Sequence, residues 1–185
     1  EVIVERHPKY KNLNIYHIPT QADPVIEKED FYSWYPEYMS HIFDLVENGE
    51  VECDTIMGHY ADGMSTGAVL KEFINSEMEG SASLLGVTHS LAVEKASRIY
   101  ESEKDKAERK SSDPDESKLK QAFNNAVEKL NMPARLAVEL AAVARCDGMI
   151  AVSNEHEQIL ADAYKYPAEK ISLIAGGVDR GVFHN

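Results

Sequence analysis

Short apolar runs alternate with segments of helical periodicity along most of the chain. The apolar runs, which end in polar residues, predict buried strands at 53–60, 84–88, 148–153 and 171–174. Apolar residues that recur every three or four positions predict helices that begin at Ala68, after Ser90, at Leu119, at Ala134 and at Asn154. Strands that alternate with helices are typical of a parallel sheet with right-handed crossovers. The pattern therefore predicts an α/β fold with a Rossmann-like, doubly wound, mainly parallel sheet.

The amino-terminal part of the chain has a different pattern. Two short apolar segments, 2–6 and 13–18, are joined by a polar turn and predict a pair of strands. The segment 26–47 carries aromatic and aliphatic residues at helical spacing, which predicts an amphipathic helix. Because Pro36 lacks a backbone N–H, we expect this helix to be interrupted near it. Its aromatic side chains are assigned to the core.

A charged segment interrupts the periodic part of the chain. Residues 98–117 are almost wholly charged or small and include the turn Asp113-Pro114. We interpret them as a solvated helix followed by a mobile loop, and not as a functional motif. Within one domain over 1–185, the stretch 99–132 is therefore expected to be a charged helical insertion or a mobile segment.

The segment 84–95 combines a strand end, a polar turn and a helix start. His89 stands where the apolar run stops, Ser90 is the expected N-cap, and Lys95 follows on the second turn of the helix. Open α/β sheets bind ligands at the carboxyl ends of their strands, and the free N–H groups of a helix start suit an anion. The pattern predicts an anion-binding corner beside His89.

The preceding strand ends in a second polar cluster. His59 and Tyr60 close this strand, so we expect them to reach the same crevice as His89. The glycine-rich segment 61–67 predicts a turn before the next helix. On the next strand along the chain, Ser153 is assigned as the N-cap of the helix that follows it.

Charge restricts the possible partners. The 185 residues include 19 basic and 32 acidic side chains, which gives a net charge of −13 at pH 7. This excess argues against nucleic acid and anionic membranes as main partners, but not against a small phosphorylated molecule, which needs only a few local cations. Since no apolar run approaches the roughly 20 residues of a membrane span and no signal peptide is visible, we expect a cytoplasmic protein.

Several common site types have no matching motif. Cys53 and Cys146 match no zinc or redox spacing, so reduced thiols are expected. The histidines outside the two strand ends do not pair with cysteine or carboxylates at metal spacing, so we predict no metal. The chain contains neither G-x-G-x-x-G nor G-x-S-x-G, which disfavours a self-contained dinucleotide cofactor site and a serine hydrolase.

Five motifs in order carry a family resemblance. They are the segment 28–38 with Lys28 and Trp34-Tyr35-Pro36, Gly58-His59-Tyr60-Ala61-Asp62-Gly63, Thr88-His89-Ser90-Leu91 with Lys95, Ile150-Ala151-Val152-Ser153-Asn154-Glu155, and Gly177-Val178-Asp179 with Phe183. Together they resemble the amino-terminal half of retaining glycosyltransferases of family 4, which have the two-domain GT-B fold, and in particular the sucrose-phosphate synthase branch. The resemblance covers nearly the whole chain except about 99–132.

The resemblance implies that the chain is a fragment of a longer enzyme. Family members begin with a strand and a Gly-rich loop, and they continue into a second Rossmann-like domain that holds the nucleotide-sugar. By this resemblance we expect the chain to enter after the first unit and to end before the second domain, and the fragment alone to be inactive. The implied full enzyme transfers glucose from UDP-glucose to fructose 6-phosphate. No cofactor is expected in this chain, and the partners are the sugar phosphate and the absent donor domain.

The resemblance also implies roles for individual residues. Lys28, Lys95 and Arg135 match basic positions that line the fructose 6-phosphate pocket in that branch. His89 matches the histidine beside the reacting centre, where a neutral imidazole hydrogen-bonds the transferred sugar. The alternative for each of the three cations is that it is an ordinary exposed side chain. The alternative for His89 is that it closes the strand end through hydrogen bonds to the backbone.

Other acceptor-side positions keep two interpretations. His59 and Tyr60 are candidate acceptor-binding residues through their place at the crevice. Asp62 either accepts a hydrogen bond from a sugar hydroxyl or caps the following helix. The branch carries several arginines around Arg135, whereas this chain has the apolar residues Ala134 and Leu140. The identity of the acceptor is therefore left open.

Three alternatives follow for the function. A family 4 enzyme with another donor or acceptor, such as one that transfers mannose to a sugar phosphate, has the same motifs. The second alternative is not an enzyme but a non-catalytic α/β binding module from a truncated gene. A regulator that binds a sugar phosphate without donor-dependent turnover is the third.

Overall fold

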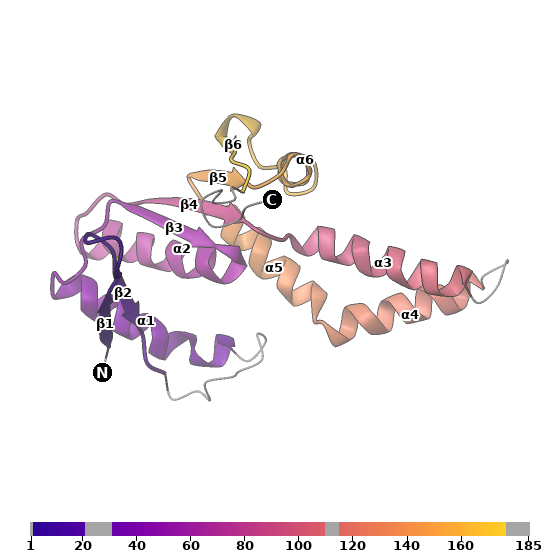
Figure 1. Cartoon of the computed structure of the whole chain (residues 1–185), viewed down its shortest axis with the longest axis horizontal. Coiled ribbons are helices and arrows are strands. Elements are labelled where there is room, and N and C mark those ends of the chain that lie inside the picture. The colour runs from indigo at the N-terminus through magenta and orange to yellow at the C-terminus, as the bar shows by residue number, and fades with distance from the viewer. Residues whose placement is uncertain (1, 21–30, 110–114, 177–185) are drawn as a thin grey trace.

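The computed structural model describes residues 2–20, 31–109 and 115–176, with the side chains of residues 31 and 32 left aside. Figure 1 shows the arrangement of the elements. In chain order they are β1 (Ile3–Arg6), β2 (Asn14–His17), α1 (Phe31–Glu47), β3 (Thr55–His59), α2 (Tyr60–Glu77), β4 (Ser83–Thr88), α3 (Ala92–Glu108), α4 (Glu116–Lys129), α5 (Met132–Val143), β5 (Gly148–Ala151), α6 (Asn154–Asp162), the short 3-10 helix Ala168–Lys170 and β6 (Ile171–Leu173).

A parallel sheet forms the centre of the fold. Its four strands lie in the order β3-β4-β5-β6, and every pair is parallel. The predicted α/β class with a Rossmann-like parallel sheet is confirmed. Within the described residues the strands follow one another in chain order, so the carboxyl ends of β3 and β4 lie side by side. This places two of the predicted polar strand ends next to each other.

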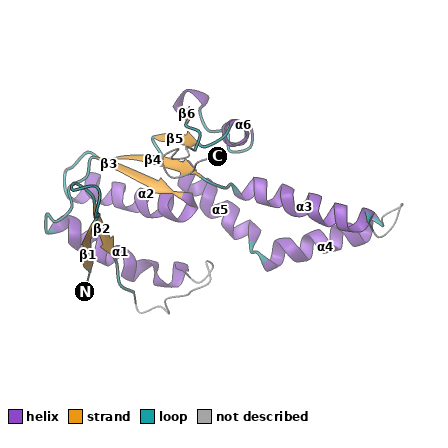
Figure 2. Cartoon of the chain, viewed as in Figure 1, coloured by secondary structure: helices purple, strands orange, loops and turns teal. Residues whose placement is uncertain are grey.

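Helices cover the buried face of the sheet. Along β4, Leu84 is fully buried and points toward α2, and α2 packs against both β3 and α5 (Figure 2). The core cluster joins these helices to the strands and to α6 through Met64, Ala68, Leu84, Leu91, Ala142, Val143, Cys146, Met149, Ala151, Leu160 and Tyr166. Because this core includes Met64 near the start of α2 and Leu91 at the N-cap of α3, it fixes the two helix starts that border the strand ends.

The helix α1 does not follow the prediction at Pro36. It is continuous from Phe31 to Glu47 and includes the proline. Pro36 lies in the second turn of α1, and the helix continues through it without the hydrogen bond that a backbone N–H would donate there. The predicted start before residue 31 lies outside the described residues. Further along, Val46 packs with Ile74 of α2 in a second cluster.

The helices α3 and α4 form an arm that projects from the sheet (Figure 1). Rings at Tyr100 and Phe123 meet edge to face with centroids 5.7 Å apart. The helix α4 has no buried residue. Asn131 then adopts a left-handed conformation, with φ 46°, and separates α4 from α5. The loop predicted around Asp113-Pro114 lies outside the described residues.

The predicted amino-terminal strand pair is confirmed as an antiparallel hairpin. Its register pairs Ile3 with His17 and Arg6 with Asn14. The hairpin is separate from the parallel sheet, and the Tyr16 hydroxyl donates a 3.3 Å hydrogen bond to the Glu50 carbonyl. Among the described helices, none has the length and apolar character needed to cross a membrane.

Candidate functional site

The turn from β3 into α2 is very tight. The helix begins at Tyr60, directly after the last strand residue His59, so the predicted glycine-rich turn at 61–67 and the helix start at Ala68 are wrong. A Cβ on Gly58 would lie 2.7 Å from the Gly63 carbonyl oxygen and from the Met64 backbone. The glycines of this motif therefore serve close packing of the strand end on the first helical turn, and not a flexible loop.

The sharp change of direction falls on Tyr60. Its φ of 58° lies in the left-handed region, which costs a residue with a Cβ about 1–2 kcal/mol. His59 is the N-cap, in extended conformation, and its side chain makes no capping hydrogen bond. Asp62 is therefore not the helix cap, because it lies inside the first turn. Its carboxylate is half-buried at the positive end of α2.

The two histidines of the strand ends contact each other. The Nδ1 atom of His59 lies 2.8 Å from the Nε2 atom of His89. The ring centroids are 5.1 Å apart with 17° between the planes, and the Tyr60 ring lies 4.8 Å from that of His89 at 36°. Both histidines are exposed, so this three-ring cluster faces solvent at the carboxyl ends of β3 and β4.

The turn from β4 into α3 also departs from the prediction. The N-cap is Leu91 and not Ser90, and carboxylates occupy the first N–H groups of the helix. Glu94 accepts from the Leu91 N–H at 3.4 Å, and Glu139 of α5 accepts from the Ala92 N–H at 2.8 Å. The N–H groups of Leu91 and Ala92 are thus occupied by carboxylates of the protein itself, and the predicted anion-binding corner has to rely on its side chains.

A buried polar network lies behind this turn. The Nε2 atom of His156 is 3.0 Å from the Glu94 carboxylate, and its Nδ1 is 3.2 Å from both the carbonyl and the hydroxyl of Thr88. The Thr88 hydroxyl donates to the Ile150 carbonyl, so it can only accept from His156. Both imidazole nitrogens therefore lie within hydrogen-bond distance of an acceptor. Arg98 forms an ion pair with Glu94 at the outer edge of this network.

Glu139 has a second partner in Tyr164, whose hydroxyl donates to its carboxylate. Burial first, and then this hydrogen bond to Glu139, raise the pKa of Tyr164. Tyr164 therefore remains a neutral donor at physiological pH, and Glu139, of which only 6% is exposed, is held between it and the start of α3. The consequence is a fixed carboxylate at the base of the candidate site.

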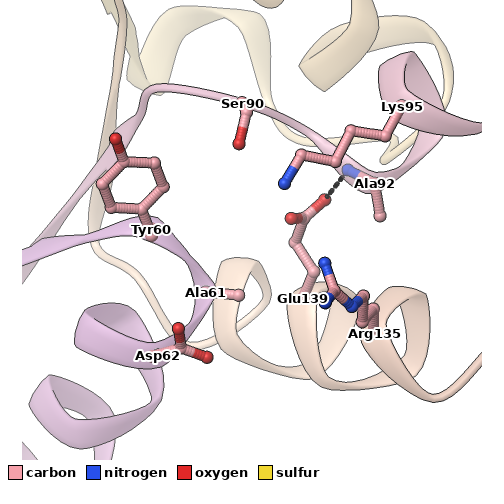
Figure 3. Close-up of a pocket in the computed structure, with 8 residues that line it drawn as sticks. All are labelled: Tyr60, Ala61, Asp62, Ser90, Ala92, Lys95, Arg135 and Glu139. Carbon is pink, nitrogen blue, oxygen red and sulfur yellow. Dashed lines mark hydrogen bonds between the residues drawn. The ribbon is translucent and has the colours of Figure 1, made fainter. Parts of the chain in front are cut away.

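A hollow opens between the starts of α2 and α3 and the helix α5. Figure 3 shows Lys95 and Arg135 directed toward it from different helices, and Glu139 also lines it. The lining residues are Tyr60, Ala61, Asp62, Ser90, Ala92, Lys95, Arg135 and Glu139. The hollow has a volume of about 30 Å³, enough for one or two water molecules. A larger ligand therefore has to bind at its rim or displace side chains.

The structure brings together most of the predicted site residues. Lys95, Arg135, Tyr60 and Asp62 line the hollow, and His59 and His89 adjoin it through the ring of Tyr60. Lys28 lies outside the described residues. The predicted cap Ser153 is confirmed, since its hydroxyl accepts from the His156 N–H at 3.2 Å.

Sequence reasoning missed three acidic and basic residues of this corner, Glu94, Glu139 and His156. Glu139 gave a usable signal, because it is a charged residue one turn after Arg135 in a helix otherwise rich in Ala and Leu. The sequence holds no comparable signal for Glu94 and His156, because the two residues that pair are 62 positions apart.

Neither a cluster of metal ligands nor the thiol of Cys146 contributes to the site within the described residues. In the described part of the chain, no three His, Cys, Asp or Glu side chains gather closely enough to hold a metal ion. Burial, and then the nearby Asp147 carboxylate, raise the pKa of Cys146 to about 12. Its thiol is therefore protonated at neutral pH and does not act as a nucleophile.

The fold and the site define a Rossmann-like α/β domain that gathers its polar groups at the carboxyl ends of adjacent parallel strands. A family model, described as Glycosyltransferase Family 4, matches residues 5–181. The chain therefore belongs to glycosyltransferase family 4, which confirms the resemblance at family level and supports a transferase. A comparison with curated proteins finds no match for this chain.

Proposed function

We propose that this domain forms the acceptor side of a retaining glycosyltransferase that transfers glucose from UDP-glucose to fructose 6-phosphate, as in a sucrose-phosphate synthase. The observation that carries the proposal is the convergence of Lys95 and Arg135, from different helices, on one hollow beside His89. Two cations on a rigid frame suit a phosphate group, and the adjacent Tyr60 and Asp62 suit sugar hydroxyls.

In the reaction, the bond between the anomeric carbon and the UDP oxygen breaks, and a bond from that carbon to an acceptor hydroxyl forms. The hydroxyl proton leaves with the departing phosphate oxygen. Lys95 and Arg135 hold the acceptor phosphate at the rim of the hollow, and His89 hydrogen-bonds the transferred sugar. The nucleotide-sugar is a co-substrate held by a second domain, so the present chain alone binds the acceptor without turnover.

A second acceptor class is favoured by one observation. Asp62 and Glu139 place two carboxylates among the residues that line the same hollow as the two cations. Their negative charges offset those of Lys95 and Arg135, which weakens the attraction of the hollow for a phosphate dianion relative to a neutral sugar. The second candidate is therefore a family 4 transferase with an unphosphorylated sugar acceptor, and its donor is then not restricted to UDP-glucose.

Calorimetric titration with fructose 6-phosphate, fructose and inorganic phosphate separates these candidates. We expect fructose 6-phosphate to bind more tightly than fructose, and Lys95→Ala to weaken that binding at least tenfold because the variant removes a direct charge contact. Lys129→Ala, an exposed lysine outside the hollow, is the matched control.

Equal binding of fructose and fructose 6-phosphate, unaffected by Lys95→Ala, supports the neutral acceptor. Absence of binding at millimolar ligand in a longer chain with its donor domain rejects both acceptors. Binding without donor-dependent turnover in that longer chain identifies a non-catalytic module.

A further inference from the structure

We propose that His59 is a positioning residue, whose Nδ1 atom selects the tautomer of His89 and leaves the second nitrogen of His89 as a hydrogen-bond acceptor. The inference deepens the proposed function, since it rests on a role for His89 beside the transferred sugar. It starts from the contact between the two rings and from the strained turn that carries His59.

The two imidazoles meet edge to edge. Their facing nitrogens are 2.8 Å apart while the centroids are 5.1 Å apart, and the planes differ by only 17°. Rings stacked face to face would bring the centroids closer than this for the same nitrogen separation. The geometry is therefore that of an N–H···N hydrogen bond lying nearly in the plane of both rings.

One proton lies between the two rings, and this couples their tautomers. If His89 donates from Nε2, His59 accepts at Nδ1 and carries its own proton on Nε2, so both rings hold the Nε2–H tautomer that free neutral histidine favours. The reverse direction requires the less favoured Nδ1–H form in both rings. We therefore assign the donor as His89 Nε2–H, which leaves the Nδ1 lone pair of His89 to accept from a ligand hydroxyl.

The backbone around Tyr60 holds His59 in this position. Tyr60 keeps a left-handed conformation, with φ 58°, and Gly58 lets the strand end pack against the first turn of α2. Strained backbone of this kind persists where the surroundings determine it and is concentrated at functional sites. The Tyr60 ring in turn contacts His89, with centroids 4.8 Å apart. The turn thus presents His59 and Tyr60 to two sides of one imidazole.

Two substitutions at residue 59 separate this role from a merely structural one. In His59→Asn the amide oxygen can occupy the place of Nδ1 and accept from His89, whereas in His59→Gln the amide lies further out, near the place of Nε2. Residue 59 is exposed, so both variants are expected to fold, and the amide NMR spectrum of each checks this.

The measurement is long-range 1H–15N NMR of the labelled imidazoles at a pH where they are neutral. We expect wild type and His59→Asn to show His89 with a protonated Nε2 and an unprotonated Nδ1, and His59→Gln to move the two 15N shifts of His89 toward each other. Identical His89 shifts in all three proteins, or a protonated Nδ1 in wild type, overturn the proposal. The fructose 6-phosphate affinities of wild type and Lys95→Ala, measured separately, test the proposed function, so that the two proposals can fail independently.

Discussion

The two turns that deliver His59 and His89 to the same edge of the sheet are built in different ways. The first passes from strand to helix without an intervening residue, uses left-handed backbone at Tyr60, and has no side-chain cap. The second is held by buried carboxylates that occupy the first N–H groups of α3. One turn depends on the absence of a Cβ at Gly58, and the other on the presence of buried charge.

The difference shows that a polar strand end can be fixed by backbone sterics or by side-chain electrostatics. In the first case no side chain serves as a cap, and the rings of His59 and Tyr60 are exposed at the surface. In the second case Glu94 and Glu139 become structural, and their carboxylates are committed to the protein. The two turns should therefore respond to different substitutions.

The largest effect is expected at the charged turn. Glu94→Ala removes the partner of His156 and of the Leu91 N–H, and breaking a buried pair of this kind costs about 4 kcal/mol of unfolding free energy. Urea unfolding measures it. Glu108→Ala, at an exposed position of the same helix, is the control and should stay within about 0.5 kcal/mol. Equal effects of both variants would mean that the network contributes no stability.

The steric turn is tested by Gly58→Ala. The new Cβ would meet backbone atoms at 2.7 Å, and backbone cannot move aside as a flexible side chain can. We expect a loss of about 3 kcal/mol in urea unfolding, the upper end for overpacked sites. Gly176→Ala adds a Cβ with nothing within 4 Å and serves as the control. A tolerated Gly58→Ala would show that the turn does not require the close approach.

The smallest effect is expected at Asp147, which lies at the amino-terminal ends of β4 and β5. Like Glu94 and Glu139 it accepts from a backbone N–H, but it lies at the surface. Its carboxylate contacts the Lys71 ammonium at 2.7 Å and accepts from the Leu84 N–H at 2.8 Å. Burial raises the pKa of Asp147, but the Lys71 ammonium and the Leu84 N–H outweigh it and hold the pKa below its ordinary value.

Because the pKa of Asp147 is lower in the folded than in the unfolded protein, its carboxylate stabilises the fold at any pH above the unfolded pKa, which is about 3.9. This stabilisation is lost as the pH falls through the folded pKa. Because the Asp147 side chain is 45% exposed, solvent screening limits the contribution to at most about 1 kcal/mol. Asp147→Asn should lower urea stability at pH 6, and the difference from wild type should shrink at pH 3. Asp44→Asn, at an exposed position, should show no such convergence.

The fold was largely predictable because its signals are local. Alternating apolar strands and periodic helices gave the parallel sheet, and Ser153 was recognisable as a cap from its place after a strand. The predictions at Pro36 and at 61–67 were wrong, because we took the proline and the glycines as residues that interrupt a helix. Here Pro36 falls close to a helix start, and Gly58 and Gly63 serve packing between a strand and a helix.

The candidate site was predictable only in part. Lys95 and Arg135 were assigned to one pocket, and they line the same hollow. Glu139 and His156 were not assigned, because their partners belong to other elements, 47 and 62 to 68 positions away in sequence. Contacts over such separations depend on how helices are placed on the sheet, which no local pattern records.

The mixture of charges around the hollow has a consequence for how fast a ligand arrives. At an ionic strength of about 0.01 M, where the Debye length is roughly 30 Å, an approaching phosphate senses the net charge of −13 before it senses Lys95 or Arg135. Long-range forces therefore oppose the encounter, and added salt should accelerate association by screening this repulsion. Such a domain selects its ligand only at contact distance, with no electrostatic steering toward the site.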